Sequence, residues 1–144
     1  MEIRVLNHSA YRTQYHIVWV RKYRHRVLNP ANFKRRVEEI IQDVGGRIVG
    51  VEIVELHAQP EHVHMVVIIP PKYAVAKVVE ILKSQSAKVM RGEIKWLDKP
   101  YYDTPSLWSV GYFVTTIGLD ENMIKRYVKY QQKQDSGQAK LEFD

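Results

Sequence analysis

Apolar runs of strand length alternate with amphipathic segments along this chain, and this alternation limits the fold more than any other feature. Four runs rich in aromatic and β-branched residues predict strands, at 15–20, 47–56, 62–69 and 107–118. Two segments between them, 30–45 and 75–90, carry apolar residues at helical spacing. A last helix is expected after Asp120, a residue type that favours helix N-caps. The predicted order is βαββαβα.

This order favours a ferredoxin-like split βαβ sandwich, an α+β fold whose two helices cover one face of an antiparallel four-stranded sheet. We expect one domain over residues 1–144, with a polar, flexible tail over about 135–144. Asn29 and Pro30 are expected to begin the first helix, and Gly45 to end it. The third strand is apolar on both faces apart from its histidines. The extra C-terminal helix, of the same or a neighbouring subunit, is therefore expected to cover the second face.

The composition narrows the class of protein. The chain has 22 Lys and Arg against 16 Asp and Glu, a formal charge of +6, which favours a polyanionic partner such as nucleic acid. It has no cysteine, which excludes disulfides and thiolate chemistry. No run resembles a signal peptide or approaches the roughly 18 apolar residues of a membrane span. We expect a cytoplasmic protein that does not contact membranes.

His62 and His64 stand two residues apart in the third predicted strand. Side chains at that spacing share one face of a strand, and neutral imidazole is a common ligand of divalent metals. The pair can therefore supply two rigid ligand positions around an ion. Two partly exposed strand histidines without a metal fit the same pattern.

Tyr127 and Gln131 stand four residues apart in the last predicted helix, so they share a helix face. From that face a phenol and a carbonyl oxygen could reach the histidine site. Because Tyr127 lies between Ile124 and Val128 on the apolar stripe, a core tyrosine is the alternative interpretation.

Three segments, PEHVHMVV, WSVGYFVTTIG and IKRYVKYQ, resemble in order and spacing the single-tyrosine HUH transposases (TnpA type) of the smallest bacterial and archaeal insertion sequences. The resemblance extends over about residues 15–134. It implies that His62 and His64 bind the metal, that Tyr127 is the nucleophile and that Gln131 is the third metal ligand. It also implies a Mg²⁺- or Mn²⁺-dependent enzyme that cleaves and rejoins single-stranded DNA at hairpin-bearing element ends.

The expected reaction passes through a 5′-phosphotyrosine and needs no nucleotide cofactor, because the covalent bond conserves the phosphoester. The resemblance implies a homodimer, and Gly118 before the last helix could act as a hinge. We therefore expect active sites shared between subunits. Tyr130 is a second tyrosine on the same helix, expected at the rim or against DNA. It keeps open the two-tyrosine mechanism of rolling-circle nucleases.

Other functions remain open at this point. One is an HUH-type replication or conjugation nickase, which would usually need further domains. Another is a non-catalytic ferredoxin-like module that binds nucleic acid. A metal hydrolase using water could add Glu55, His57 or Glu61 as ligands, and His57 is the best of these.

Basic residues in two places are candidates for DNA binding. Those after the first strand mix with aromatic rings, and those on the second helix lie on its polar side. The candidates are Arg21, Lys22, Arg24, Arg26, Lys83, Lys88 and Arg91. By contrast, Lys34, Arg35 and Arg36 are expected to form a solvated helix face with Glu38 and Glu39.

Overall fold

The computed structural model describes residues 3–6, 9–22, 30–93, 107–118 and 120–135. Four strands form one antiparallel sheet in the order β4–β5–β3–β6, and β1 pairs with β2 in a separate hairpin. The sheet strands are β3 (Gln14–Val20), β4 (Glu52–Ala58), β5 (His62–Ile68) and β6 (Phe113–Thr115). The hairpin strands are β1 (Arg4–Leu6) and β2 (Ser9–Tyr11), and the helices are α1 (Pro30–Gly46), α2 (Val75–Glu93) and α3 (Glu121–Asp135).

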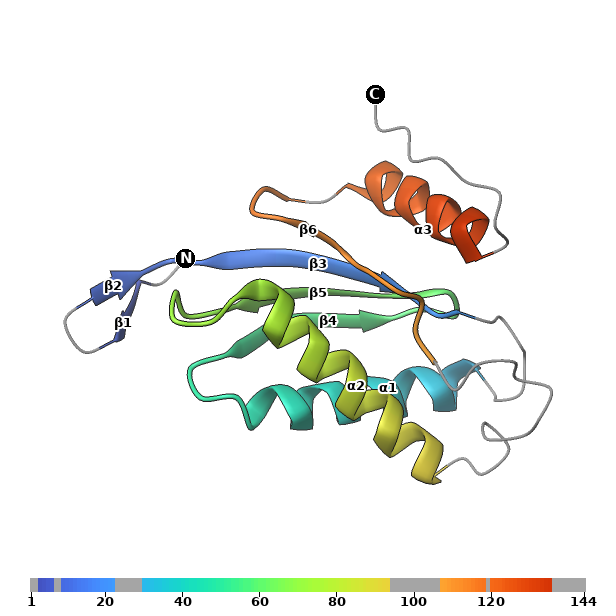
Figure 1. Ribbon diagram of the computed structural model, residues 1–144, viewed down its shortest axis with the longest axis horizontal. Helices are drawn as coiled ribbons and strands as arrows, with labels where there is room; N and C mark the ends of the chain where they lie inside the picture. The colour runs from blue at the N-terminus through green and yellow to red at the C-terminus, as the bar shows by residue number, and fades with distance from the viewer. Residues whose placement is uncertain (1–2, 7–8, 23–29, 94–106, 119, 136–144) are drawn as a thin grey trace.

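The helices lie on opposite sides of this sheet. In Figure 1, α1 and α2 lie together on one side and α3 lies on the other. The strand order places β5 between β4 and β3, as the split βαβ arrangement requires. The predicted ferredoxin-like fold and the predicted place of the last helix are therefore confirmed.

The two central strands explain this division of the helices. Alternate residues of a strand face opposite sides of the sheet. Ile17 and Trp19 of β3, with Met65 of β5, belong to the large buried cluster under α1 and α2. Val18 and Val20 belong to a second buried cluster, with residues of α3. Each central strand thus contributes apolar side chains to both faces of the sheet. The sequence predicted this for residues 62–69, the strand that is β5 in the structure.

A β-bulge in β4 decides which of its residues face α3. Ile53 pairs with Val67 and Glu55 with Val66, so Val54 is an extra residue in the ladder. Before the bulge Ile53 packs on the large cluster, and after it Leu56 does so. The change of phase turns His57 to the α3 side, where it pairs directly with His64. The sequence pattern did not predict this bulge.

Several predicted boundaries were wrong. The second strand begins at Glu52, not at residue 47, because residues 47–50 form a turn that ends at Gly50 with φ +87°. Of the predicted strand 107–118 only β6 is a strand, and Gly111 has φ +94°, a conformation that strands do not use. The hairpin of β1 and β2 was missed, and α1 extends one residue beyond Gly45.

The helix ends agree better with the sequence. Pro30 is the first residue of α1, while Asn29 lies outside the described residues. Asp120 caps α3, because its Oδ1 accepts a hydrogen bond from the backbone N–H of Met123 at 2.8 Å. The α3 helix extends to Asp135, so the expected tail overlaps its last residue, and residues 136–144 lie outside the described part. None of the described helices has the length and apolar character to cross a membrane.

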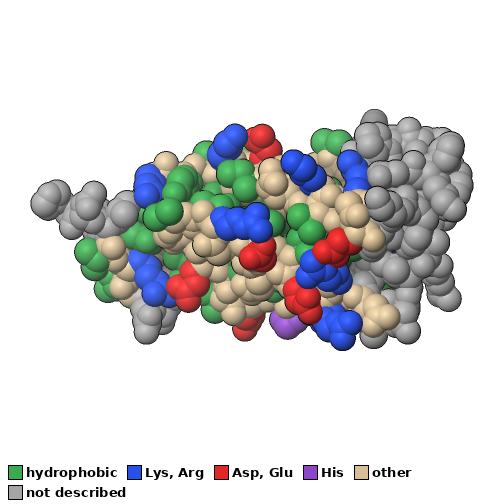
Figure 2. Space-filling view, turned by 90° about the horizontal axis from the view of Figure 1, so that it is seen from below, with side chains coloured by type: hydrophobic (Ala, Val, Ile, Leu, Met, Phe, Trp, Pro, Cys, Tyr) green, Lys and Arg blue, Asp and Glu red, His purple; other side chains and the backbone are tan. Residues whose placement is uncertain are grey.

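The outer face of α1 and α2 carries charges of both signs. Figure 2 shows blue and red side chains interspersed over this face. Lys34 pairs with Glu38 at 2.7 Å and Arg36 with Glu39 at 3.0 Å. The expected solvated helix face is confirmed, so this part of the surface is not a continuous basic patch.

Replacing Gly50 with Ala should destabilise the fold by about 1–3 kcal/mol, because a side chain at positive φ is strained. A Cβ there would also lie 2.7 Å from Cγ of Pro70. Gly46 is the matched control: a Cβ at this helical position meets no atom within 4 Å, so Gly46→Ala should be neutral or stabilise by up to about 1 kcal/mol. Urea unfolding of both variants measures the difference. Equal changes at the two positions would contradict this account of the turn.

Candidate active site

Four histidines lie on the α3 side of the sheet. His64 of β5 lies between His16 of β3 and His57 of β4, with ring centroids 6.2 Å away in each case. His62 shares the face of His64, as its spacing predicts. His16 was not among the predicted residues, although its position two residues before Val18 in an alternating strand places it on this face.

The two predicted ligand histidines are held as neutral imidazoles. Burial lowers the pKa of His62, although the Glu61 carboxylate opposes this effect. Burial also lowers the pKa of His64, and the neighbouring histidines add to the shift. Neutral imidazole is the form that binds metals.

Each of these rings has a nitrogen that is not engaged by a hydrogen bond within the described part of the chain. Nδ1 of His62 lies 3.2 Å from Oε1 of Glu61, a contact that fixes the ring and leaves Nε2 to accept. Nε2 of His64 is buried and has no hydrogen-bond partner in the described part of the chain. Both rings therefore suit a metal ion. Within the described residues of one subunit, no three His, Asp or Glu side chains are arranged to hold one.

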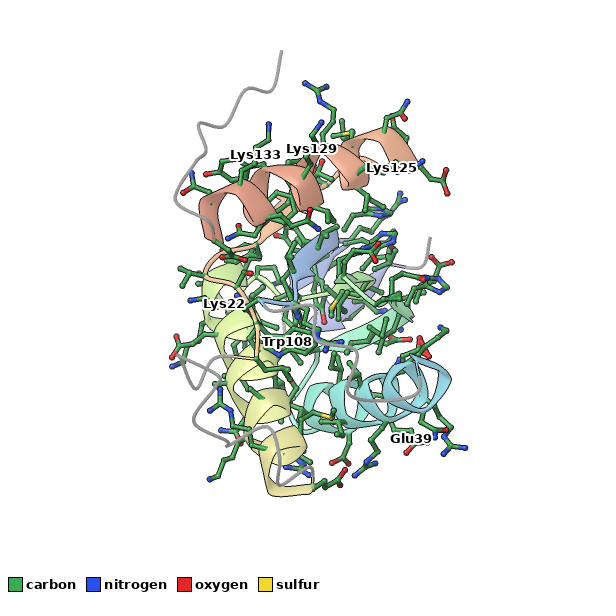
Figure 3. The ribbon with its side chains drawn as sticks, turned by 90° about the vertical axis from the view of Figure 1, so that its right-hand side faces the viewer. Lys22, Glu39, Trp108, Lys125, Lys129 and Lys133 are labelled. Carbon is green, nitrogen blue, oxygen red and sulfur yellow. The ribbon has the colours of Figure 1, made fainter. Side chains whose placement is uncertain are left out.

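A groove exposes the histidines to solvent beside α3. Its sheet side is formed by His57, Gln59, Glu61, His62 and His64. Its helix side is formed by Glu121, Ile124 and Lys125. A neighbouring groove beside His62 also involves Lys129. These lysines were not predicted to lie at the site, although their spacing of four residues places them on one side of the helix. Figure 3 shows Lys125, Lys129 and Lys133 in succession along α3.

Tyr127 lies in a separate environment on α3. It is 5% exposed, and its hydroxyl donates to Oε1 of Gln131 at 3.3 Å. Its ring lies 5.7 Å from the ring of Phe113 and 6.3 Å from that of Tyr130. Burial raises the pKa of Tyr127, and Tyr130 and Asp135 raise it further. The phenol is therefore fully protonated at neutral pH.

The structure thus brings the predicted residues together in two pairs. His62 and His64 face the groove, which Tyr127 does not line. Tyr127 and Gln131 contact each other on the β6 side of α3, near Phe113 and Gly111. The two pairs lie over the same face of the sheet but turn toward different edges of it.

The predicted DNA-binding residues have different environments. Arg24 and Arg26 lie outside the described residues. Lys88 is exposed and Arg91 is half-buried beside the segment 107–111. The backbone N–H groups of Arg21 and Lys22 donate to the carbonyls of Glu61 and Leu107. The ammonium group of Lys83 is bonded to the backbone carbonyls of Ser109 and Gly111.

Known proteins resemble this chain over most of its length. Residues 9–131 match the family described as "Transposase IS200 like". The transposase for insertion sequence element IS200 of Salmonella typhimurium is 30% identical over 133 residues, which cover 90% of this chain and 84% of that protein. The ISDra2 transposase TnpA of Deinococcus radiodurans is 28% identical over 123 residues, 85% of this chain and 86% of that one.

Two solved structures are also similar. The crystal structure of a candidate transposase from Deinococcus radiodurans R1 superposes with a TM-score of 0.75 at 27% identity, covering 89% of this chain and 97% of that one. A REP-associated tyrosine transposase bound to a REP hairpin has a TM-score of 0.52 at 15% identity, which shows a shared fold; it covers 90% of this chain and 73% of that one. The match over residues 9–131 and the IS200 relative together establish that this chain belongs to the IS200-like transposase family.

Proposed function

We propose that this transposase cleaves and rejoins single-stranded DNA at hairpin-bearing element ends, with Tyr127 as the nucleophile. The observation that carries the proposal is that α3 lies over the same face of the sheet as His62 and His64 and bears both Tyr127 and Gln131. A phenol, two neutral imidazoles and an amide oxygen on one face are the groups that metal-assisted phosphoryl transfer by tyrosine requires.

His62 and His64 would hold a divalent ion, Mg²⁺ or Mn²⁺, with the amide oxygen of Gln131 as third ligand. Support comes from the buried Nε2 of His64, which has no partner among the described residues, and from the contact of His62 with Glu61. When bound, such an ion polarises the scissile phosphate and offsets its developing negative charge. The oxygen of Gln131 has a second lone pair beyond the one that accepts from Tyr127.

Tyr127 acts on the phosphorus atom through its phenol oxygen. The new bond joins this oxygen to the phosphate, and the bond between phosphorus and the 3′ oxygen breaks. The phenol loses its proton to solvent and the departing oxygen takes one up, which leaves a 5′-phosphotyrosine and a free 3′-hydroxyl. Because burial raises the pKa of Tyr127, the phenol needs an oriented phosphate to react. The reverse reaction with a different 3′-hydroxyl rejoins the DNA.

Tyr130 is proposed to contact DNA at the rim. Its ring packs against Tyr127, and its hydroxyl accepts a hydrogen bond from Nε2 of Gln134 at 3.1 Å. It does not line the groove of the histidines.

The active protein is proposed to be a homodimer in which His62 and His64 of one subunit work with Tyr127 of the other. Two observations support this assembly. The first is that Tyr127 lies on the β6 side of α3, away from the groove of its own histidines. The second is that β6 forms an edge of the sheet, next to exposed apolar side chains at Val110 (79%) and Ile117 (71%). A dimer across this edge would cover them.

DNA binding is proposed for the basic residues around the groove and on α2. The excess of Lys and Arg favours a polyanion, and Lys125 and Lys129 border the histidine site. The tyrosine transposase of similar fold was solved with a REP hairpin, which supports a hairpin as the feature recognised here.

Incubation with Mg²⁺ and single-stranded oligonucleotides that carry hairpins should give a covalent protein–DNA adduct on a denaturing gel. A 3′ label should stay with the protein, because the 5′-phosphate of the downstream fragment is attached, and a 5′ label should leave on a fragment with a free 3′-hydroxyl. Tyr127→Phe should lower adduct formation at least 100-fold, and chelation of the metal should abolish it.

The matched control is Tyr130→Phe, which removes a hydroxyl from the same helix and should retain adduct formation within about threefold. The proposal fails if Tyr130→Phe loses the adduct while Tyr127→Phe keeps it, since that result points to the other tyrosine. DNA binding without any adduct would indicate a non-catalytic module.

A further inference from the structure

Lys83 is a half-buried lysine on α2 whose ammonium group bonds to the backbone of the segment 107–111. Its Nζ donates hydrogen bonds to the backbone carbonyls of Ser109, at 2.6 Å, and Gly111, at 2.8 Å. Burial lowers the pKa of Lys83 to about 8, so the charged form with its three N–H donors still predominates at neutral pH. The ammonium group is thus bonded within the chain, at the wall of an open groove.

The segment 107–111, which Lys83 holds, is irregular, and its backbone bonds to β3 and the residues after it lie at 107–109: the N–H of Lys22 donates to the carbonyl of Leu107 at 3.0 Å. Trp108 makes an isolated bridge with Arg21, and the N–H of Ser109 donates to the carbonyl of Val20 at 2.8 Å. The carbonyls of Ser109 and Gly111 find their donor in Lys83 instead. Removing that donor would leave the part-buried carbonyl of Ser109 without its partner, and it would release the exposed carbonyl of Gly111 from α2.

The same segment is bonded to α3 at one point and lies close to it at another. The hydroxyl of Ser109, which is 1% exposed, donates to Oδ2 of Asp135 at 2.6 Å, at the end of the helix. Gly111 lies beside the nucleophile, since a Cβ built there would be 3.9 Å from the hydroxyl oxygen of Tyr127. The position of residues 109–111 therefore fixes both the end of α3 and the space next to the phenol.

We infer that Lys83 is a positioning residue for Tyr127: it anchors residues 109–111 to α2, and these residues hold α3 and border the hydroxyl of Tyr127. The inference rests on the proposed role of Tyr127 as nucleophile. The sequence predicted that Lys83 contacts DNA, like the other basic residues of α2. The inferred role is different, because the ammonium group acts on residues 109–111 and not on a phosphate. It also links α2, whose Lys88 and Arg91 are proposed to bind DNA, to the helix that carries the nucleophile.

Kinetics separate the two roles of Lys83. Lys83→Met should lower the rate of adduct formation at saturating hairpin DNA at least tenfold, while the Kd for the same DNA changes no more than about twofold. Lys83→Arg can still donate to two carbonyls, and it should keep at least a third of the wild-type rate. The matched control is Lys88→Met on the exposed side of the same helix, which should weaken DNA binding without lowering the rate at saturation.

A distance measurement tests the inference without catalysis. Because the chain has no cysteine, spin labels can be placed at Gln85→Cys on α2 and Asn122→Cys on α3, with excess unlabelled protein to prevent signals between subunits. The distance distribution should be narrow in the otherwise wild-type protein and with Lys83→Arg, and broadened or shifted with Lys83→Met. If Lys83→Met does not fold, Ser109→Ala, which removes the bond to Asp135, should broaden it instead.

An unchanged distribution in Lys83→Met, together with a loss of DNA affinity as large as that of Lys88→Met, would overturn the inference and make Lys83 a phosphate contact. Absence of adduct in the wild-type protein would count against the proposed function instead. The distance distributions would then still decide whether Lys83 positions α3.

Discussion

The antiparallel ladder between β3 and β5 is the interaction on which the rest of this structure depends. It runs from the pair Gln14 and Ile68 to the pair Val20 and His62 without a shift in register. Because alternate side chains face opposite sides, this register sends one set to α1 and α2 and the other set to α3. A slip of one residue in either strand would exchange the two faces, moving His62 and His64 into the main core. The ladder therefore sets the packing and the candidate site together.

The sheet face under α3 carries both packed apolar side chains and the proposed site residues. The pKa shifts of those site residues follow from this shared burial. Val18 and Val20 exclude water beneath α3, and the same exclusion lowers the pKa of His64 and raises that of Tyr127. Both groups are consequently neutral before DNA arrives. In the proposed reaction the neutral imidazoles would bind the metal, whereas the phenol would become a good nucleophile only when a phosphate and an ion are placed next to it. This difference suits an enzyme that should cut only correctly bound DNA.

Much of the fold could be predicted from periodicity, because the strands and helices with strong patterns are also those that pack. The pattern of β5 predicted both its faces, and Asp120 marked the start of α3. The bulge at Val54 was not predictable, since a bulge arises from pairing between strands and leaves no local signal. The partners of Lys83 were not predictable for a similar reason: its helical spacing is that of a solvated lysine, and the carbonyls it bonds belong to residues 26 and 28 positions later in the chain. The assignment of Tyr127, Gln131 and the two histidines remains a prediction.

The central claim is that the histidines of one subunit act with Tyr127 of the other, and mixed subunits test it most directly. His64→Ala protein and Tyr127→Phe protein, each inactive alone, are exchanged into heterodimers, with tags of different mass on the two chains. The account predicts that one intact site forms in each heterodimer, so adduct formation returns and the DNA is attached to the His64→Ala chain. If heterodimers are present by mass but no adduct forms, every site lacks one part, and the claim that the site is shared between subunits is contradicted.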